Sequence, residues 1–163
     1  MGRKPEFLHP YLLAHFRRTA AAFQARYPGA PVPVLTETHR SSEEQTALYA
    51  QGRNTPEEVN RLRKIAGLGP IAPAQNKVVT HAPAGKSLHN FSPALAYDIG
   101  FRTTDAGLDW SEQLFRQFAA LARQDPLIEW GGEWPGAKRD MPHFQFKGMT
   151  WAKALAGVDP LRL

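Results

Sequence analysis

One carboxylate in an apolar stretch constrains this chain more than any other feature. Residues 94–99 read Ala-Leu-Ala-Tyr-Asp-Ile, which indicates a buried strand, and Asp98 lies inside it. A carboxylate is costly to bury unless a metal ion or a hydrogen-bonding partner compensates its charge. Asp98 therefore predicts that a polar site is built into the part of the chain that forms the core.

Two histidines offer partners of suitable chemistry. His89 precedes Asp98 in a loop-like segment, and His143 lies far downstream beside Asp140. Most single histidines bind no metal, so His89 alone would be weak evidence. Two imidazoles and one carboxylate together make a zinc site with an open fourth position, which is typical of catalytic zinc. Because the chain has no cysteine, thiolate ligands and disulfides are excluded.

Three blocks of residues resemble a known family, the M15 zinc peptidases. Ser87-Leu88-His89 followed by Ala96-Tyr97-Asp98 is similar to the Ser-x-His…Ala-x-Asp signature of that family. Residues 130–134, Trp-Gly-Gly-Glu-Trp, before the Asp-x-x-His of residues 140–143 resemble its L-alanyl-D-glutamate endopeptidase branch, which includes phage lysis enzymes. Residues 40–53, from Arg-Ser to Leu-Tyr-Ala-Gln-Gly-Arg, are similar to its N-terminal segment. The blocks occur in family order between about residues 34 and 146.

The chain departs from the family at one point. Ser92-Pro93-Ala94 stands where the family often has a glycine, and it lengthens the segment between the two ligands. We expect the chain to bulge around Pro93 and still bring both ligands to the metal.

The resemblance implies a fold and a set of site residues. The fold would be α+β: a single domain, residues 1–163, with a small, mostly antiparallel sheet flanked by helices, as in D-alanyl-D-alanine peptidases and hedgehog-like proteins, and no separate wall-binding domain. His89, Asp98 and His143 would hold one zinc ion, whose bound water would be activated for attack on the scissile carbonyl. Asp140 would be the general base. The predicted substrate-binding residues are Arg40, Gln45 and Ser87.

Two of these roles have alternatives in the sequence itself. Arg40 suits a substrate carboxylate because a guanidinium can bind it through two parallel hydrogen bonds. It could instead form a surface salt bridge with Glu43 or Glu44, and Gln45 could be solvated. Asp140 could be a metal ligand, or a turn residue before Pro142.

The predicted activity is hydrolysis of peptidoglycan stem peptides, at the L-alanyl-D-glutamate bond, by a phage-type endolysin. One alternative is a D-alanyl-D-alanine carboxypeptidase, but carboxypeptidases tend to have Glu at the position of Asp140. Another is a zinc-containing module that binds cell wall without catalysis, in which a general base would have no purpose.

Charge and hydropathy suggest where such a protein acts. The net charge of +5 and the isoelectric point of about 9.7 predict attraction to anionic cell-wall or envelope surfaces. No basic-aromatic motif indicates nucleic acid, and no segment is long and apolar enough to span a membrane. Prolines and the Arg17-Arg18 pair interrupt any apolar core of a secretory signal near the N-terminus. We expect a monomer made in the cytoplasm that reaches the wall after release, through a holin.

Apolar periodicity and capping residues predict the secondary structure. Ser41 with Glu44 forms a capping-box pattern, and Thr55 suits the start of another helix. The expected helices span residues 10–26, 42–51, 56–65 and 110–123, with a helical turn at 151–156. The expected strands span residues 32–38, 78–80, 94–100, 127–130 and 143–146, and residues 67–76 are expected to form a loop.

Overall fold

A computed structural model describes residues 4–163 of the chain. Residues 1–3, at the start of the segment that was assessed for a secretory signal, lie outside the described residues. Among the helices that are described, none combines the length and the apolar character needed to cross a bilayer.

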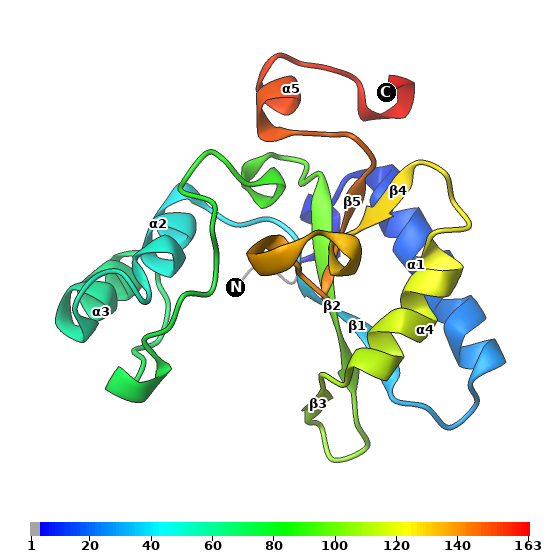
Figure 1. Ribbon diagram of the computed structural model, residues 1–163, viewed down its shortest axis with the longest axis horizontal. Helices are drawn as coiled ribbons and strands as arrows, with labels where there is room; N and C mark the ends of the chain where they lie inside the picture. The colour runs from blue at the N-terminus through cyan, green and yellow to red at the C-terminus, as the bar shows by residue number, and fades with distance from the viewer. Residues whose placement is uncertain (1–3) are drawn as a thin grey trace.

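The centre of the molecule is an antiparallel sheet with the strand order β1-β2-β5-β4, and β3 pairs with β2 (Figure 1). The strands are β1 (Val32–Glu37), β2 (Ala96–Arg102), β3 (Leu108–Asp109), β4 (Ile128–Trp130) and β5 (His143–Phe146). The register places Asp98 of β2 directly opposite His143 of β5. Pairing of neighbouring strands therefore brings together two residues far apart in the sequence.

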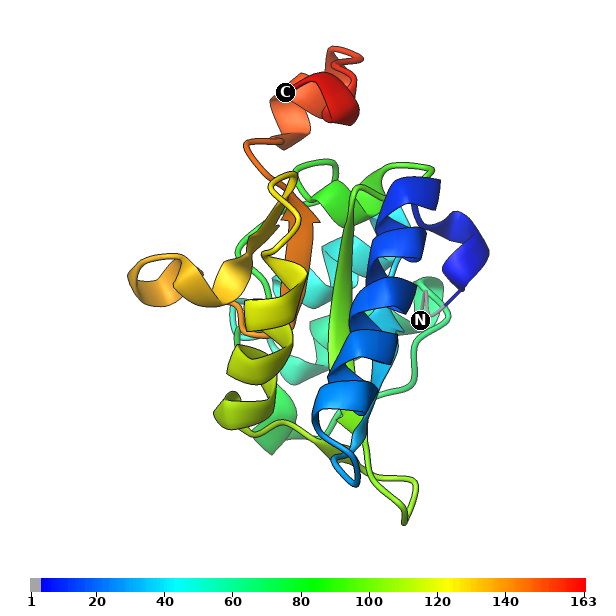
Figure 2. The same ribbon diagram turned by 90° about the vertical axis from the view of Figure 1, so that its right-hand side faces the viewer.

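Helices lie on both sides of this sheet, as Figures 1 and 2 show. On one side, α1 (Pro10–Arg26) and α4 (Glu112–Ala122) pack against each other and cover the sheet. On the other side, α2 (Ser42–Ala50) and α3 (Pro56–Ile65) form a separate pair. The short α5 (Trp151–Leu155) and the residues after it project away from the sheet (Figures 1 and 2). The predicted α+β fold, a single domain with an antiparallel sheet flanked by helices, is confirmed.

Alternation along the strands separates the core from the polar site. Successive side chains of a strand point to opposite faces of a sheet. Tyr97 on β2 and Phe144 on β5 are fully buried and stack with ring centroids 5.4 Å apart, and Phe118 of α4 contacts Phe144 at 5.3 Å. Their neighbours Asp98 and His143 must then face away from α1 and α4. The same two strands therefore build the apolar core on one face and a polar cluster on the other.

Most elements lie where the sequence predicted them. Helix α1 and strand β5 have the predicted bounds, and α2 begins with the predicted capping box of Ser41 and Glu44. The loop at residues 67–76 contains one short 3-10 turn, Pro73–Gln75. Helix α4 begins at Glu112, so Trp110 lies outside it.

Two predictions about strands were incomplete or wrong. Residues 78–80 form no strand, although Val78 and Val79 have high strand propensity. Both valines are about half exposed (47% and 56%), so no neighbouring strand or core surface favours extension into the sheet. Side chains hold the segment instead: Gln45 and Arg53 both donate hydrogen bonds to Thr80. Strand β3 was not predicted from the sequence, because two residues are too few to show the alternation of apolar and polar side chains that marks a strand.

Candidate metal centre

Three separate elements supply the predicted metal ligands. His89 lies in the 3-10 turn Leu88–Asn90, Asp98 lies in the middle of β2, and His143 begins β5. The Ser87 hydroxyl accepts a hydrogen bond from the His89 backbone N–H at the start of that turn. The backbone N–H of Leu95 donates to Leu88 at 3.0 Å, which closes the loop between the turn and β2. The additional residues of the Ser-Pro-Ala segment lie within this closed loop, and both ligands still reach the site.

The three ligand atoms form a compact triangle. Asp98 Oδ1 lies 3.1 Å from His143 Nδ1 and 3.3 Å from His89 Nε2, and the two nitrogens are 3.3 Å apart. Zinc bonds of about 2.0–2.1 Å in a tetrahedral site place neighbouring ligand atoms about 3.3–3.4 Å apart. The spacing of these atoms therefore fits a metal ion of this size, and the group could hold one.

Outer hydrogen bonds determine which nitrogen of each imidazole faces the centre. His89 Nδ1 lies 2.7 Å from the carbonyl oxygen of Thr38, which can only accept, so this nitrogen carries the proton. His143 Nε2 lies 2.9 Å from Gln145 Oε1 and donates to it. In the neutral rings, the two inner nitrogens then point lone pairs at each other and at a carboxylate. Only a cation, either a proton or a metal ion, makes this arrangement favourable.

The imidazoles also change the acidity of Asp98. Burial by itself raises the pKa of this carboxyl group, but His89 and His143 outweigh that effect and hold the pKa well below its usual range. Burial opposes the charged form of His143, yet its hydrogen bond to Asp98 and the negative charges nearby raise its pKa above the ordinary value. The chain therefore keeps Asp98 ionised and favours positive charge at the centre of the triangle.

Asp140 lies beside the triangle but outside the group of ligating atoms. Asp140 as a whole is exposed at the edge of the site, while the protein around its carboxyl group displaces part of the water there. This loss of water raises the pKa of Asp140, and the negative charge of Asp98 raises it further. His143, His89 and Arg40 partly oppose the rise. The carboxyl group is thus within electrostatic reach of two ligands and of the predicted substrate-binding arginine.

The two glycines of the Trp-Gly-Gly segment are needed for this placement. The Asp140 backbone N–H donates to Gly131 O at 2.9 Å, and a Cβ on Gly131 would lie 2.6 Å from Asp140 O. A Cβ on Gly132 would lie 2.1 Å from the Trp130 ring. Side chains at these positions would push the loop that carries Asp140 away from β4. Trp130 is buried in the core, whereas Trp134 is partly exposed and packs on His143 at 5.0 Å between ring centroids.

Arg40 is partly enclosed beside the site. Its side chain is 12% exposed, and its partner is Glu37, not Glu43 or Glu44 as the surface alternative supposed. Arg40 Nε and Nη2 both lie 3.2 Å from Glu37 Oε2, and Nη1 lies 3.0 Å from Gln45 Oε1. The Arg40 backbone N–H donates to His89 O at 2.8 Å. Arg40 is therefore attached directly to the turn that carries His89, a predicted metal ligand.

Gln45 is fully buried, so the solvated alternative is wrong. Its Oε1 accepts from Arg40, and its Nε2 donates to Thr80 Oγ1 at 3.3 Å and Ala82 O at 2.6 Å. The amide links Arg40 to the segment that follows α3. Substrate binding by Arg40, Gln45 and Ser87 stays a prediction.

Several residues of the site were missed from the sequence. The side chains of Gln145 and Glu129 lie behind His143, on the same face of the sheet as the predicted ligands. Because side chains two residues apart on a strand share a face, the position of His143 could have indicated Gln145. The Thr38 carbonyl could not have been found, because a backbone acceptor leaves no signature in the residue type.

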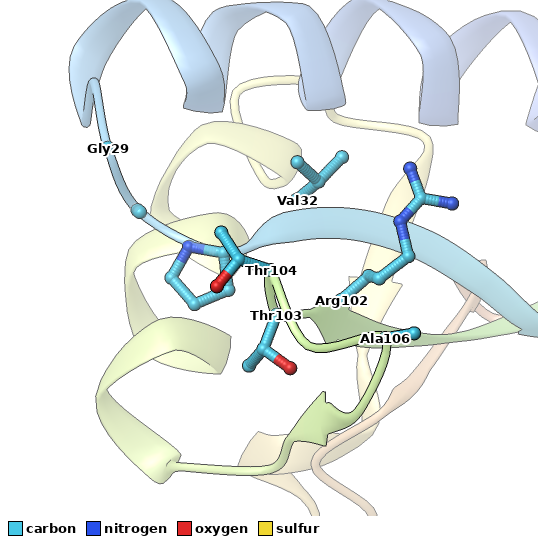
Figure 3. A pocket seen from close by; sticks show the side chains of 8 residues that line it. Gly29, Val32, Arg102, Thr103, Thr104 and Ala106 are labelled. Atoms are coloured by element: carbon cyan, nitrogen blue, oxygen red, sulfur yellow. The ribbon is translucent and has the colours of Figure 1, made fainter.

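A separate hollow lies beside Arg102, at the C-terminal end of β2 (Figure 3). Its lining includes Gly29 and Val32 before and in β1, and Arg102, Thr103, Thr104 and Ala106 at the β2–β3 turn. These residues include none of the predicted ligands or substrate-binding residues. The hollow therefore takes no part in the site.

Comparison with known proteins supports the family resemblance. No family model matches the chain. The peptidoglycan L-alanyl-D-glutamate endopeptidase CwlK of Bacillus subtilis is 27% identical over 151 residues, which cover 86% of this chain and 74% of CwlK. The crystal structure of the L-Ala D-Glu endopeptidase ChiX of Serratia marcescens matches the fold with a TM-score of 0.50 and 21% identity, covering 88% of this chain and 83% of ChiX.

The ChiX likeness concerns the fold, and the CwlK likeness extends through most of both sequences. CwlK and ChiX are both L-alanyl-D-glutamate endopeptidases, the branch that the motifs of this chain resemble. The chain is therefore a relative, in sequence and in fold, of the L-alanyl-D-glutamate endopeptidases of the M15 type.

Proposed function

We propose that this protein is a zinc peptidase that hydrolyses the L-alanyl-D-glutamate bond of peptidoglycan stem peptides. The observation that carries the proposal is the triangle of His89, Asp98 and His143 with the carboxyl group of Asp140 beside it. A zinc ion bound there would act as a Lewis acid on the scissile carbonyl and acidify a water molecule. The relatedness to CwlK and ChiX supports the choice of bond.

The residues of the chain have distinct tasks in this proposal. His89, Asp98 and His143 hold the ion. Asp140 accepts a proton from the attacking water and transfers it to the amine of the leaving D-glutamate. Its raised pKa brings it nearer to the pH at which such a base must both accept and release a proton.

Arg40 is proposed to bind a carboxylate of the stem peptide. A guanidinium has five N–H donors, and the contacts to Glu37 and Gln45 use three of them. Donors therefore remain for a ligand while Glu37 and Gln45 hold the plane of the group. Gln45 would act through Arg40, since its own amide is buried. The Ser87 hydroxyl proton and the exposed part of Trp134 are available for further contacts with the peptide.

Product analysis tests this proposal. Purified peptidoglycan and a synthetic stem peptide would be incubated with the zinc-loaded protein, with and without a chelator, and the products identified by mass spectrometry. We expect chelator-sensitive cleavage that yields a free L-alanine carboxyl group and a free D-glutamate amino group. Release of D-alanine would identify a carboxypeptidase instead. Wall binding without any cleavage would identify a non-catalytic module.

We further propose that the activity serves lysis from inside the cell, as in phage-type endolysins. The basic net charge would favour contact with an anionic wall. Bacteria that make the protein in the cytoplasm should stay intact until their membrane is permeabilised, and then lyse. Lysis without permeabilisation would contradict this role and leave the peptidase assignment standing.

A further inference from the structure

Two side chains behind His143 have no part in the proposed reaction, yet they form a continuous hydrogen-bonded chain to it. Gln145 and Glu129 are Cα partners on β5 and β4. By strand alternation both lie on the site face, while their neighbours Phe144, Phe146 and Ile128 belong to the core. Gln145 is 8% exposed, so its amide depends on protein partners for its hydrogen bonds.

The orientation of the Gln145 amide follows from its neighbours. Gln145 Nε2 lies 2.6 Å from Glu129 Oε1 and 3.2 Å from the carbonyl oxygen of Met149. Both of these are acceptors, so the amide nitrogen must face them and both of its hydrogens are used. The amide oxygen is therefore turned to His143 Nε2, at 2.9 Å.

Glu129 is itself held in place. Its Oε2 accepts the backbone N–H of Gly148 at 3.2 Å, in the turn that follows β5. A flipped Gln145 amide would set the amide oxygen against a carboxylate and would present N–H to His143. Glu129 therefore excludes the flipped state by charge and by hydrogen bonding.

We infer that Gln145, oriented by Glu129, is a positioning residue that keeps the His143 proton on Nε2 and so directs Nδ1 to the metal. This inference rests on the proposed metal centre. Partners of this kind behind a histidine ligand fix its ring orientation and tautomer, and their loss commonly lowers metal affinity about 10–100-fold. Neither residue would touch the substrate.

The principal test is Gln145→Met, which has a similar length and volume but no hydrogen-bonding amide. Zinc affinity would be measured by competition with a chromophoric chelator, and folding by circular dichroism and thermal unfolding. We expect affinity to fall about 10–100-fold while the protein stays folded. A folded Gln145→Met protein that binds zinc like wild type would overturn the inference.

Gln51→Met is the matched control. Gln51 is also buried (4% exposed) and accepts a hydrogen bond from Arg63 at 2.7 Å, but it lies between α2 and α3. This variant should lose stability to a similar degree and keep wild-type zinc affinity. An equal loss of affinity in both variants would show that general destabilisation is responsible, and would overturn the specific role of Gln145.

Exchanging the two side chains gives a sharper test that does not depend on the Met variant. Gln145→Glu alone sets two carboxylates against each other and should weaken zinc binding. Adding Glu129→Gln places one amide and one carboxylate in contact again, and the carboxylate now accepts the hydrogen bond from His143. The double variant should recover most of the zinc affinity. Absence of recovery in a folded double variant would contradict the inference.

A spectroscopic measurement on the wild-type protein completes the test. Two-bond 1H–15N correlation spectra of the zinc-loaded protein should show the His143 proton on Nε2. A proton on Nδ1 would overturn the inference about Gln145. A wild-type protein that binds no zinc at all would reject the metal centre itself, an outcome separate from zinc binding with unchanged affinity in Gln145→Met.

Discussion

The two faces of the central sheet use the same strands for different purposes. On the face covered by α1 and α4, Tyr97 and Phe144 are fully buried among aromatic rings. On the opposite face, their chain neighbours Asp98 and His143 meet at 3.1 Å with paired charges and partial access to solvent. One residue along the chain therefore separates a side chain that stabilises the fold from one suited to chemistry. The core face holds the strands rigidly, which keeps the ligand triangle on the other face in its geometry.

The largest expected contrast is between substitutions of two adjacent residues, His143 and Phe144, in their effects on zinc binding and on stability. The first substitution is His143→Ala. Removing one of three ligands should abolish zinc binding and reduce peptidase activity to the level of chelator-treated wild type. Stability without metal should also fall, by less than for the core substitution below, because Asp98 and Gln145 each lose a hydrogen-bonding partner. Metal analysis, activity assays and urea unfolding in chelator would check this. Full zinc occupancy in the variant would show that His143 is no ligand.

On the core face, Phe144→Ala should have the opposite pattern. Phe144 is fully buried and contacts the rings of Tyr97, Phe118 and Trp130. Its truncation should lower the free energy of unfolding by about 3–5 kcal/mol through lost burial and the cavity left behind. The fraction that remains folded should bind zinc normally, as measured by urea unfolding and metal titration. A loss below about 1 kcal/mol would mean that the two faces are less distinct than described.

At the edge of the site, Asp140→Asn tests chemistry without a change of shape. The amide cannot accept the proton, and loss of a general base commonly lowers the rate about 10²–10⁴-fold. Zinc content and melting temperature should stay near wild type because Asp140 is exposed and outside the ligand group. Near-normal turnover on a stem peptide would exclude Asp140 as the base and restore the alternative of a turn residue.

A smaller effect is expected for Arg40→Lys, which keeps the charge but loses the planar pair of donors. Transition-state stabilisation, measured from the change in kcat/KM, should fall by about 1.5–3 kcal/mol. This is the range for hydrogen bonds to charged groups. The matched control is Arg61→Lys, since Arg61 makes a similar two-bond pair with Glu58 on exposed α3. Equal kinetics in the two variants would assign Arg40 a structural role with Glu37.

The smallest expected effect concerns pH and a histidine of the core face. His15 is buried between Tyr97 OH and Ala122 O, with Asp125 and Arg18 nearby, and burial lowers its pKa. The unfolded chain therefore binds a proton that the folded chain resists, so stability is complete above the ordinary histidine pKa of about 6.5 and declines below it. Urea unfolding from pH 7.5 to 5 should show a weaker decline for His15→Gln than for wild type. Identical pH dependence would contradict this account.

Local pattern and motif together predicted much of this molecule. Helix α1 was predicted because its apolar residues recur at helical spacing after Pro10, and α2 because Ser41 and Glu44 form a capping box. His89, Asp98 and His143 were predicted to lie together because a carboxylate inside an apolar strand needs compensation, and the structure brings the three side chains together. Residues 78–80 were predicted wrongly because two valines have strand propensity, while pairing depends on a partner strand that is absent there.

The sequence by itself determined the fold class, the ligand types and the family, because each depends on residue identity at short spacing or on motif order. Tertiary structure decided what depends on distant partners. Strand register set Asp98 opposite His143, and the Thr38 carbonyl selected the free nitrogen of His89. Hydrogen bonds from Gln45 to Thr80 and Ala82 bury the amide that accepts from Arg40. These contacts join segments far apart in the chain, and only the folded sheet brings their atoms within hydrogen-bonding distance.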